Sequence, residues 1–350
     1  MSSHRRVRND HLVLIAVIST LLIASPSISN YGYFDITKVA YGQSDPNQMN
    51  SNTTSSVNIQ DIPLKKVRVG DIDIAYEMFG KGEPILLISG AGGDMNSWDP
   101  STLKNLSSNH TVIIFDNRGV AKTTTGSKAF SIQQFVNDTV GLLDVLKIQK
   151  ADVLGHSMGG MVAQQLAVTH PEKVNRLILV STTCGGKDSI PPSPQVVKLA
   201  TEFENKLLNN IPITPQEIKL TMSASLGPAW IRLYPNSLDA IPKAGVPSQD
   251  LFPGVPVNTV VQQQKVVLNW RATSWIGICD ELSKISNPTL IITGTDDGSI
   301  QPANSLIIAG KIPGAWLVQI KNAGHAVMGQ YPEEMGKIMN TFLSTTGQNR

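Results

Sequence analysis

The chain has 350 residues, of which 41% are hydrophobic, and its 29 Lys and Arg nearly balance its 27 Asp and Glu, leaving a formal charge of +2. This length is enough for one large α/β domain with a sizeable core, or for two small domains. This near-neutral balance is not the footprint of a nucleic-acid-binding protein, whose binding face needs a basic stripe, so we expect no nucleic-acid partner.

The amino terminus has the pattern of an export signal. A basic stretch that ends at Arg8 precedes an apolar run from Leu12 to Ala24, which is shorter than the ~20 residues that span a bilayer as a helix. Small residues follow the run, and cleavage after Ser29 would fit them. We therefore expect residues 1–29 to be a signal peptide or, alternatively, an uncleaved membrane anchor. The mature protein is expected to be secreted or extracytoplasmic, and to associate with a membrane through this segment only.

Residues 30–62 are polar and rich in turn-forming residues, so we expect a flexible linker there. Beyond the linker, apolar runs alternate with helical patterns. Strands are predicted at 66–69, 72–78, 84–88, 111–115, 152–154, 176–180, 289–293 and 316–320. Helices are predicted at 132–146, 158–168, 302–310 and 332–343. Runs that are apolar on both faces suit the interior of a covered parallel sheet, so the predicted fold is α/β with a doubly wound, mostly parallel sheet.

One long segment interrupts this alternation. Residues 187–285 contain many prolines, no clear strand and broken helical patterns. Because strands of the same predicted sheet flank the segment, we expect a helical cap or lid inserted into a core made of residues 63–186 and 286–350. Within or beside this segment, two features stay open from sequence. Trp230, Trp270 and Trp275 could line a pocket or form the cap's own core, and Cys184 and Cys279 could form a disulfide or remain free thiols.

The segment from Gly155 to Gly160 reads Gly-His-Ser-Met-Gly-Gly and lies between a predicted strand and a predicted helix. Gly-x-Ser-x-Gly in that context is typical of a nucleophile elbow, a strained turn that lifts the serine hydroxyl above the sheet. The alternative is an ordinary glycine-rich strand–helix turn. We expect Ser157 to be a catalytic nucleophile, with the N–H of Met158 facing any oxyanion formed there.

A serine nucleophile needs a base, and the chain has only six histidines. His4 and His11 lie in the export signal, His110 begins a strand at the wrong end of the sheet, His156 is inside the elbow, and His170 ends a helix. His325 remains, on the loop after the last predicted strand, where open α/β sheets place their sites. We therefore expect His325 to be the catalytic base.

The third catalytic group must be an acid that orients the histidine. Asp296 and Asp297 directly follow a predicted apolar strand and are both candidates. Either one gives the chain order Ser, Asp, His that is expected of this arrangement. Asp138 and Asp144 lie on a predicted helix and are interpreted as solvated charges.

An oxyanion hole needs a second N–H donor from the loop after the strand at 84–88. Ser89 to Gly93 is a loop of small residues that can approach a substrate closely, and the N–H of Ala91 is our candidate beside that of Met158. Phosphate binding by this loop is disfavoured, because no Gly-Lys-Ser/Thr follows it. Residues 116–119, Asp-Asn-Arg-Gly, are expected to organise their loop through a buried ion pair.

With these motifs in this order, residues 65–345 resemble the α/β-hydrolase superfamily, in its group of single-domain esterases, lactonases and perhydrolases. The resemblance implies that the acid is Asp297, because the family places it in a Gly-x-x-Asp pattern counted from Gly294. It also implies a mechanism without metal or cofactor. The chain departs from the family at Ser89-Gly90, where His-Gly is common, and at Val120 to Thr123.

The expected catalytic set is therefore Ser157, Asp297 and His325, with Ala91 and Met158 as oxyanion donors. The expected activity is hydrolysis of carboxylic esters, thioesters or lactones of small molecules through an acyl-serine intermediate. The alternatives are perhydrolysis or carbon–carbon bond hydrolysis on the same residues, and a non-catalytic receptor for small molecules.

Overall fold

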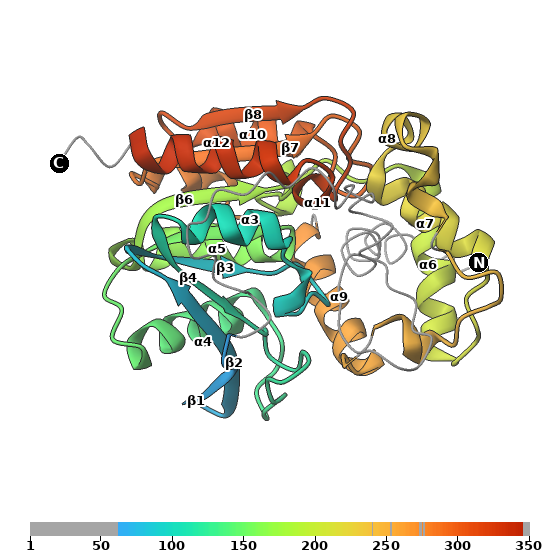
Figure 1. Ribbon diagram of the computed structural model, residues 1–350, viewed down its shortest axis with the longest axis horizontal. Helices are drawn as coiled ribbons and strands as arrows, with labels where there is room; N and C mark the ends of the chain where they lie inside the picture. The colour runs from blue at the N-terminus through green and yellow to red at the C-terminus, as the bar shows by residue number, and fades with distance from the viewer. Residues whose placement is uncertain (1–61, 240, 253, 273–274, 276, 346–350) are drawn as a thin grey trace, which may run out of the picture.

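The computed structural model describes residues 62–239, 241–252, 254–272, 275 and 277–345. Its centre is an eight-stranded sheet with the order β1-β2-β4-β3-β5-β6-β7-β8 (Figure 1). β2 is antiparallel to its neighbours β1 and β4, and every other neighbouring pair is parallel. The strands are β1 (Lys65–Val69), β2 (Ile72–Gly80), β3 (Glu83–Ile88), β4 (His110–Phe115), β5 (Ala151–His156), β6 (Val174–Val180), β7 (Thr289–Gly294) and β8 (Trp316–Ile320). The predicted mostly parallel sheet is confirmed.

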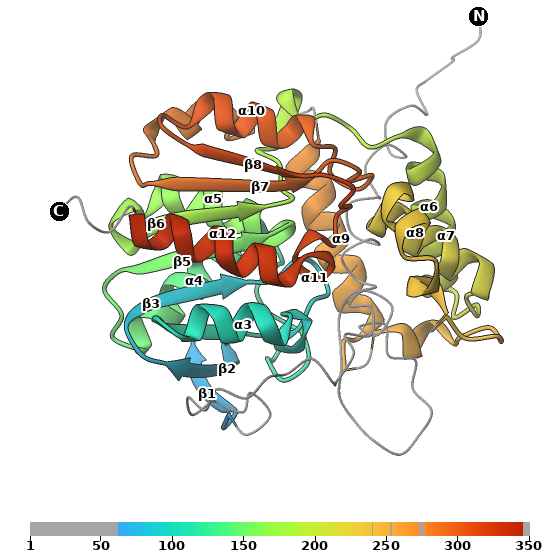
Figure 2. The same cartoon turned by 45° about the horizontal axis from the view of Figure 1, so that its top comes forward.

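Helices cover both faces of the sheet, because successive strand residues point to opposite sides. In β3, Leu86 and Ile88 belong to the core beneath α4, α5 and α10, whereas Ile85 and Leu87 belong to the core beneath α3 and α12 (Figure 2). These helices are α3 (Pro100–Ser107), α4 (Ile132–Val145), α5 (Met158–Thr169), α10 (Ala303–Lys311) and α12 (Pro332–Thr345). The doubly wound arrangement predicted from the apolar runs is therefore confirmed.

The long segment between β6 and β7 is mainly helical. Its α-helices are α6 (Pro194–Leu208), α7 (Pro215–Leu226), α8 (Pro228–Leu233) and α9 (Val257–Arg271). Among its described residues the pairing typical of strands is limited to one bridge, between Ile213 and Val246. α9 lies beside the carboxyl ends of the strands, and α6, α7 and α8 lie further from the sheet (Figures 1 and 2). The inserted segment thus stands at the edge of the sheet where the strands end.

The three tryptophans of this segment take part in its packing. Trp230 and Trp270 are buried, and the Trp230 ring stacks on that of Tyr234 with centroids 4.1 Å apart. Trp270 donates a hydrogen bond from Nε1 to the carbonyl of Thr183 (3.0 Å), and Trp275 donates one to the carbonyl of Trp270 (2.6 Å). These contacts fit the interpretation of the tryptophans as core residues of the segment and of its junction with the sheet.

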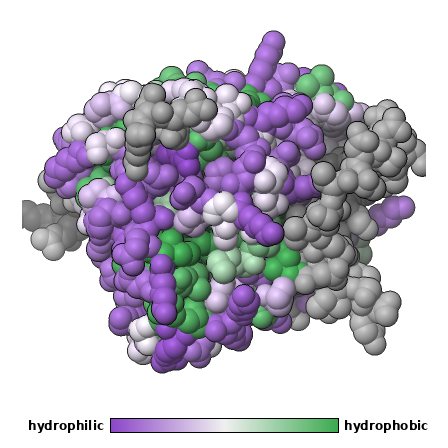
Figure 3. Space-filling view, turned by 60° about the vertical axis from the view of Figure 1, so that its left-hand side comes forward, coloured by the Kyte–Doolittle hydropathy of each residue, from purple (hydrophilic) through white to green (hydrophobic). Residues whose placement is uncertain are grey.

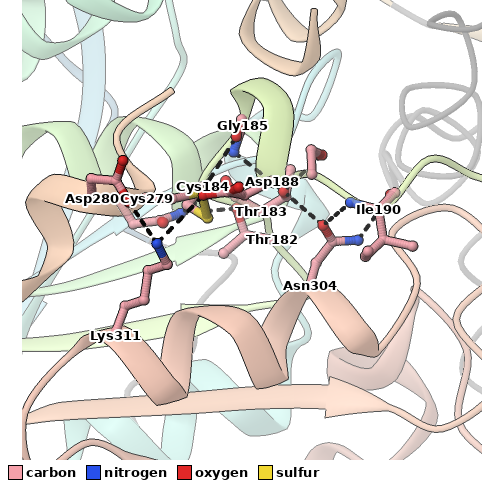
Figure 4. The surroundings of a disulfide bond; sticks show 12 residues. Thr182, Thr183, Cys184, Gly185, Asp188, Ile190, Cys279, Asp280, Asn304 and Lys311 are labelled. Atoms are coloured by element: carbon pink, nitrogen blue, oxygen red, sulfur yellow. Dashed lines mark hydrogen bonds and ion pairs between the residues drawn. A yellow bond between two sulfur atoms is a disulfide. The ribbon is translucent and has the colours of Figure 1, made fainter. Parts of the chain in front are cut away.

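A disulfide joins the two ends of the inserted segment. Cys184 follows β6, Cys279 begins the short helix η8 (Cys279–Lys284) before β7, and their Cα atoms are 5.0 Å apart (Figure 4). The N–H of Ile278 donates to the carbonyl of Cys184 (3.1 Å). Nearby, Asn304 of α10 accepts from the N–H of Ile190 at 2.9 Å. Of the two states that the sequence left open, the structure therefore has the disulfide.

Arg118 is the centre of a buried ion-pair network. It donates to both carboxylate oxygens of Asp138 (2.9 and 2.7 Å) and to both of Asp71 (3.0 and 2.8 Å). Burial alone would lower the pKa of Arg118, but the two carboxylates hold it above its usual value. The interpretation of Asp138 as a solvated charge was wrong, because its side of α4 faces Arg118 and it is only 4% exposed. The predicted ion pair exists, and it links α4 to the turn between β1 and β2.

The opposite edge of the sheet, where the parallel strands begin, carries a separate polar cluster. His110 lies 3.8 Å from the carboxylate of Asp152, which also accepts two hydrogen bonds from Arg176 (2.7 and 2.8 Å). Figure 3 brings this side of the molecule forward and shows a mostly hydrophilic face with a hydrophobic area in its lower half. His110 is therefore at the far end of the sheet from the loops that follow the strands, as expected.

The predicted signal peptide at 1–29, and the predicted linker except for residue 62, lie outside the described residues. Across the described ranges, no helix combines the length and the apolar character needed to cross a membrane.

Candidate active site

Ser157 occupies the turn between β5 and α5 in a strained backbone conformation. Its φ of 54° lies in the left-handed region, which non-glycine residues enter at a cost of about 1–3 kcal/mol. Its N–H donates to the carbonyl of Val180 at 2.9 Å. The flanking glycines are required by space, because a Cβ on Gly155 would lie 2.3 Å from the carbonyl oxygen of Gly159. The turn thus has the geometry that the Gly-x-Ser-x-Gly pattern predicts.

His325 lies on the loop after β8 and contacts Asp297, which lies on the loop after β7. His325 Nδ1 is 2.8 Å from Asp297 Oδ2, and both side chains are fully buried. The other carboxylate oxygen accepts from the N–H groups of Ser299 (2.9 Å) and Ile300 (2.8 Å). Because an ionised carboxylate can only accept, Nδ1 carries the proton and Nε2 is the basic nitrogen of the neutral ring.

Asp296 faces away from this pair. Its Oδ2 accepts a hydrogen bond from the N–H of Ala229 at the start of α8 (3.2 Å), and its Oδ1 accepts one from the hydroxyl of Thr295 (3.2 Å). The two adjacent carboxylates therefore have separate partners. Asp297 orients His325, whereas Asp296 attaches the inserted segment to the loop after β7.

The last turn of α7 holds the backbone around His325. The N–H of His325 donates to the carbonyl of Ser225 at 2.7 Å. Gln330, in the short helix α11 (Val327–Gln330), accepts from the N–H of Gly324 (2.8 Å) and donates to the carbonyl of Leu226 (2.7 Å). The loop after β8 that carries His325, called the histidine loop below, is consequently fixed by the inserted segment as well as by the sheet.

The loop from Ser89 to Gly93 packs against the first turn of α5. A Cβ on Gly159 would lie 1.9 Å from the carbonyl oxygen of Ile88, so the two backbones touch. The N–H groups of Ala91 and Met158 are buried and donate no hydrogen bond to any residue that the structure describes. Two buried, unused donors, one on the loop after β3 and one at the start of α5, form an arrangement that can stabilise an oxyanion.

His156, set aside as a base from the sequence, contacts the candidate site in another way. Its Nε2 is 3.2 Å from the carbonyl oxygen of His325, and the two ring centroids are 5.1 Å apart. Burial is the main cause that lowers the pKa of His156 to about 3, and the nearby ring of His325 contributes to this shift. The ring is therefore neutral near pH 7. It carries its proton on Nε2, because a carbonyl can only accept.

The structure places all five sequence-predicted residues at the carboxyl edge of the sheet. It joins His325 to Asp297. His156 links the turn around Ser157 between β5 and α5, called the serine turn below, to the histidine loop. Sequence reasoning missed the contribution of α9, where Gln263 Oε1 accepts from the N–H of Gly92 at 2.6 Å. The available signal was the run of three glutamines at 262–264 within a helix of mostly apolar buried residues, which no motif marks.

Asp116, which follows β4 at the same edge of the sheet, has a raised pKa. Burial raises the pKa of its carboxyl to about 7, and hydrogen bonds from the N–H groups of Lys122 and Met95, each 2.9 Å, oppose that shift. Asp116 therefore organises two loops, and Arg118 pairs with other carboxylates.

Among the described residues, no group of three or more His, Cys, Asp or Glu side chains is arranged to hold a metal ion.

Comparison with known proteins gives a match over most of the chain. Residues 83–330 match the profile of the family described as alpha/beta hydrolase fold. The matched range begins at β3 and contains the serine turn, both aspartates and His325.

Individual relatives have low sequence identity to this chain, but the aligned region covers nearly their whole length. A protein of Azorhizobium caulinodans named "Putative carbamate hydrolase RutD" is 25% identical over 280 residues, covering 80% of this chain and 98% of the relative. The Mycobacterium tuberculosis protein named "Putative non-heme bromoperoxidase BpoC" is 28% identical over 287 residues, with coverage of 78% and 98%. A solved thermophilic esterase from Thermogutta terrifontis superimposes with a TM-score of 0.64 at 24% identity, covering 81% and 98%. That structural likeness shows a shared fold.

Proposed function

Because the chain belongs to the alpha/beta-hydrolase fold family, we propose that it is a serine hydrolase that cleaves carboxylic esters, thioesters or lactones of small molecules. Ser157 would be the nucleophile, His325 the base and Asp297 the orienting acid. The observation that carries this proposal is the fully buried 2.8 Å contact between Asp297 and His325, beside a serine held at a φ of 54°. A strained serine and a buried Asp–His pair are costly features that acyl transfer uses.

The proposed reaction has two halves. His325 Nε2 takes the proton of the Ser157 hydroxyl while Oγ bonds to the acyl carbon, and the N–H groups of Ala91 and Met158 stabilise the oxyanion. As the oxyanion collapses, the bond to the leaving alcohol, thiol or lactone oxygen breaks, and His325 returns the proton to that atom. Water then loses a proton to His325 as its oxygen bonds to the acyl carbon, the bond from that carbon to Ser157 Oγ breaks, and His325 returns the proton to Oγ, which releases the carboxylic acid and the free serine.

Asp297 stays ionised through both halves of the reaction. Its Oδ2 keeps Nδ1 of His325 protonated and stabilises the transient imidazolium, while two backbone N–H groups stabilise its other oxygen. His156 has a supporting part in this scheme, because it holds the carbonyl of His325 without becoming charged near pH 7.

A fluorophosphonate probe tests the proposal directly. The purified protein should gain the mass of one phosphonyl group, and peptide mapping should locate it on Ser157. Hydrolysis of short-chain 4-nitrophenyl esters should disappear in step with the labelling. A folded protein that stays unlabelled and cleaves no ester of a panel varying in acyl and alcohol length would favour the small-molecule receptor.

We also propose that the protein acts outside the cytoplasmic membrane. The basic residues before the apolar run from Leu12 to Ala24 support export. The disulfide between Cys184 and Cys279 also supports it, because such bonds persist in oxidising compartments. Fractionation with amino-terminal sequencing tests this: a cytoplasmic protein that keeps Met1 would contradict export.

A further inference from the structure

α9 carries an unusual concentration of buried polar atoms without partners. Across the described residues, 14 buried side-chain nitrogen or oxygen atoms lack a hydrogen-bond partner, and four of these belong to α9. They are Nε2 of Gln263, both amide atoms of Gln264, and Nη1 of Arg271. Folded proteins leave few such atoms, since each costs about 1–3 kcal/mol when unsatisfied. Three of the four are donors, so an oxygen-rich ligand would satisfy them.

Arg271 is the most demanding of these groups because it is a cation. It is only 7% exposed, and the structure gives it one hydrogen bond, from Nη2 to the carbonyl of Ile190 (3.2 Å). Burial lowers the pKa of Arg271 to about 10, and the charge of Asp297 opposes the shift. The guanidinium therefore stays charged near pH 7. Asp297 does not satisfy it, because no hydrogen bond or ion pair joins the two side chains among the described residues, and Nη1 of Arg271 has no partner.

The position of α9 places these atoms beside the proposed catalytic residues. Gln263 contacts the loop that offers Ala91, through the N–H of Gly92. Arg271 donates to the carbonyl of Ile190, to which Asn304 also donates, and Asn304 lies on α10, the helix that follows the loop of Asp297. Eight residues of helix separate the two positions, which corresponds to about 12 Å. Gln264 and Arg271 are seven residues apart and lie on the same face of the helix. α9 lies beside the carboxyl ends of the strands, the edge of the sheet from which the loops of Ala91 and Asp297 start (Figures 1 and 2).

We propose that α9 selects the substrate, and that Arg271, together with the amide of Gln264, binds a carboxylate carried by the ester, thioester or lactone. This inference rests on the proposed hydrolase function and specifies its substrate class. One guanidinium matches one carboxylate, and the nearby charge of Asp297 disfavours a dianion such as a phosphate monoester. The carboxylate belongs to the acyl part or to the leaving group, at the end of the substrate away from the reacting carbonyl.

Matched substrates test the proposal in the full chain. The charged substrates are the 4-nitrophenyl monoesters of adipate and suberate, and 4-acetoxybenzoate. Each is compared with the compound in which the free carboxylate is a methyl ester, so that the reacting ester is the same but the charge is absent. A charge-assisted hydrogen bond is worth about 1.5–3 kcal/mol, so we expect at least one pair to favour the carboxylate by about tenfold or more in kcat/KM. Hydrolysis of the neutral compounds without preference in any pair would overturn the carboxylate site and leave the hydrolase proposal standing.

Variants separate recognition from structural support. Arg271→Met should reduce the ratio of kcat/KM for the charged and blocked substrates by about tenfold or more, and Arg271→Lys should keep part of the preference. Lys265→Met is the matched control, because Lys265 is an exposed cation on the same helix, and it should leave the ratio unchanged. Equal losses on charged and blocked substrates in Arg271→Met would show a structural role and overturn the proposal.

Binding can be measured independently of turnover. Calorimetric titration of adipate into the Ser157→Ala protein should show binding that Arg271→Met weakens by about tenfold or more and that Lys265→Met does not change. If the wild-type protein cleaves no ester at all, the hydrolase proposal fails, and this titration still decides the carboxylate site. Absence of binding, or binding that is indifferent to Arg271, would overturn it.

Discussion

His156 and His325, one in the serine turn and the other on the histidine loop, are joined by a 3.2 Å contact between an imidazole nitrogen and a backbone carbonyl. His156 is therefore a half-buried, neutral hydrogen-bond donor that precedes the candidate nucleophile. Two titratable rings lie 5.1 Å apart, and only one of them is proposed to exchange protons during turnover.

The lowered pKa of His156, which burial causes, makes the stability of the protein sensitive to acid. The folded-state pKa of His156, about 3, is below its unfolded value of about 6.5, so its contribution is fully present above pH 6.5 and is lost as the pH falls toward 3. Relative to His156→Gln, which keeps a donor but does not titrate, the wild type should lose about 1.4 kcal/mol of unfolding free energy per pH unit within that window. Urea unfolding at several pH values measures the difference.

The contribution of Asp116 to the unfolding free energy changes with pH in the opposite direction. The comparison of wild type with His156→Gln removes this contribution. Its folded-state pKa of about 7 is raised, so its contribution is present below pH 3.8 and is lost as the pH rises toward 7. Because Asp116 is present in both proteins, it cancels from their difference. Parallel pH curves for wild type and His156→Gln would contradict the lowered pKa of His156 in the folded protein.

Ser157→Ala should lower kcat for a 4-nitrophenyl ester by about 10⁴-fold or more, because no other hydroxyl replaces the strained nucleophile. Ser181→Ala is the matched control: Ser181 is also buried, has a φ of 48°, and follows the neighbouring strand β6. We expect that variant to stay within about tenfold of wild type by steady-state assay. Comparable turnover by folded Ser157→Ala protein would refute the acyl-serine mechanism.

Asp297→Asn and Asp296→Asn form a second matched pair. Asp297→Asn should lose about 10⁴-fold in kcat, because an amide at this position no longer fixes the Nδ1–H tautomer of His325. Asp296→Asn should remain within about tenfold of wild type, because an amide oxygen can still accept from the N–H of Ala229. Thermal unfolding verifies that both variants fold, and the reverse ranking of their kcat values would show that the acid is Asp296.

Reduction of the Cys184–Cys279 disulfide should destabilise the protein by about 2–5 kcal/mol, because the bond closes a loop with a sequence separation of 95 residues. Urea unfolding with and without dithiothreitol measures the loss. The double variant Cys184→Ala with Cys279→Ala should be indifferent to the reductant. A wild-type protein with equal stability in both conditions would show that the bond contributes nothing to folding.

The features that could be predicted from sequence have a local physical cause. The run Ile85 to Ile88 is apolar at every position because the strand is buried on both faces, and the Gly-x-Ser-x-Gly turn needs glycine wherever backbones touch. Apolar periodicity likewise predicts most helices. α3 was not predicted, although Pro100 begins it and Asp99 caps it by accepting from two N–H groups, because its apolar stripe is short.

The features that could not be predicted depend on contacts between distant segments. Asp138 looks like a surface charge on an amphipathic helix until Arg118, 20 residues away, is folded against it. The separate partners of Asp296 and Asp297 follow from the packing of α8 and the histidine loop. Gln263 and Arg271 belong to no motif, and only the placement of α9 brings them to the carboxyl edge of the sheet.

The attachment of the histidine loop to α7 limits how the inserted segment can be exchanged. The carbonyls of Ser225 and Leu226 hold His325 and Gln330, so the segment is part of the scaffold of the proposed base. Grafting a whole segment from a relative, as a route to new specificity, would detach that loop unless the carbonyls were reproduced. Changes confined to the α9 face that carries Gln264 and Arg271 leave the attachment intact. Natural or engineered substitutions that change specificity are therefore better tolerated on α9 than at the end of α7.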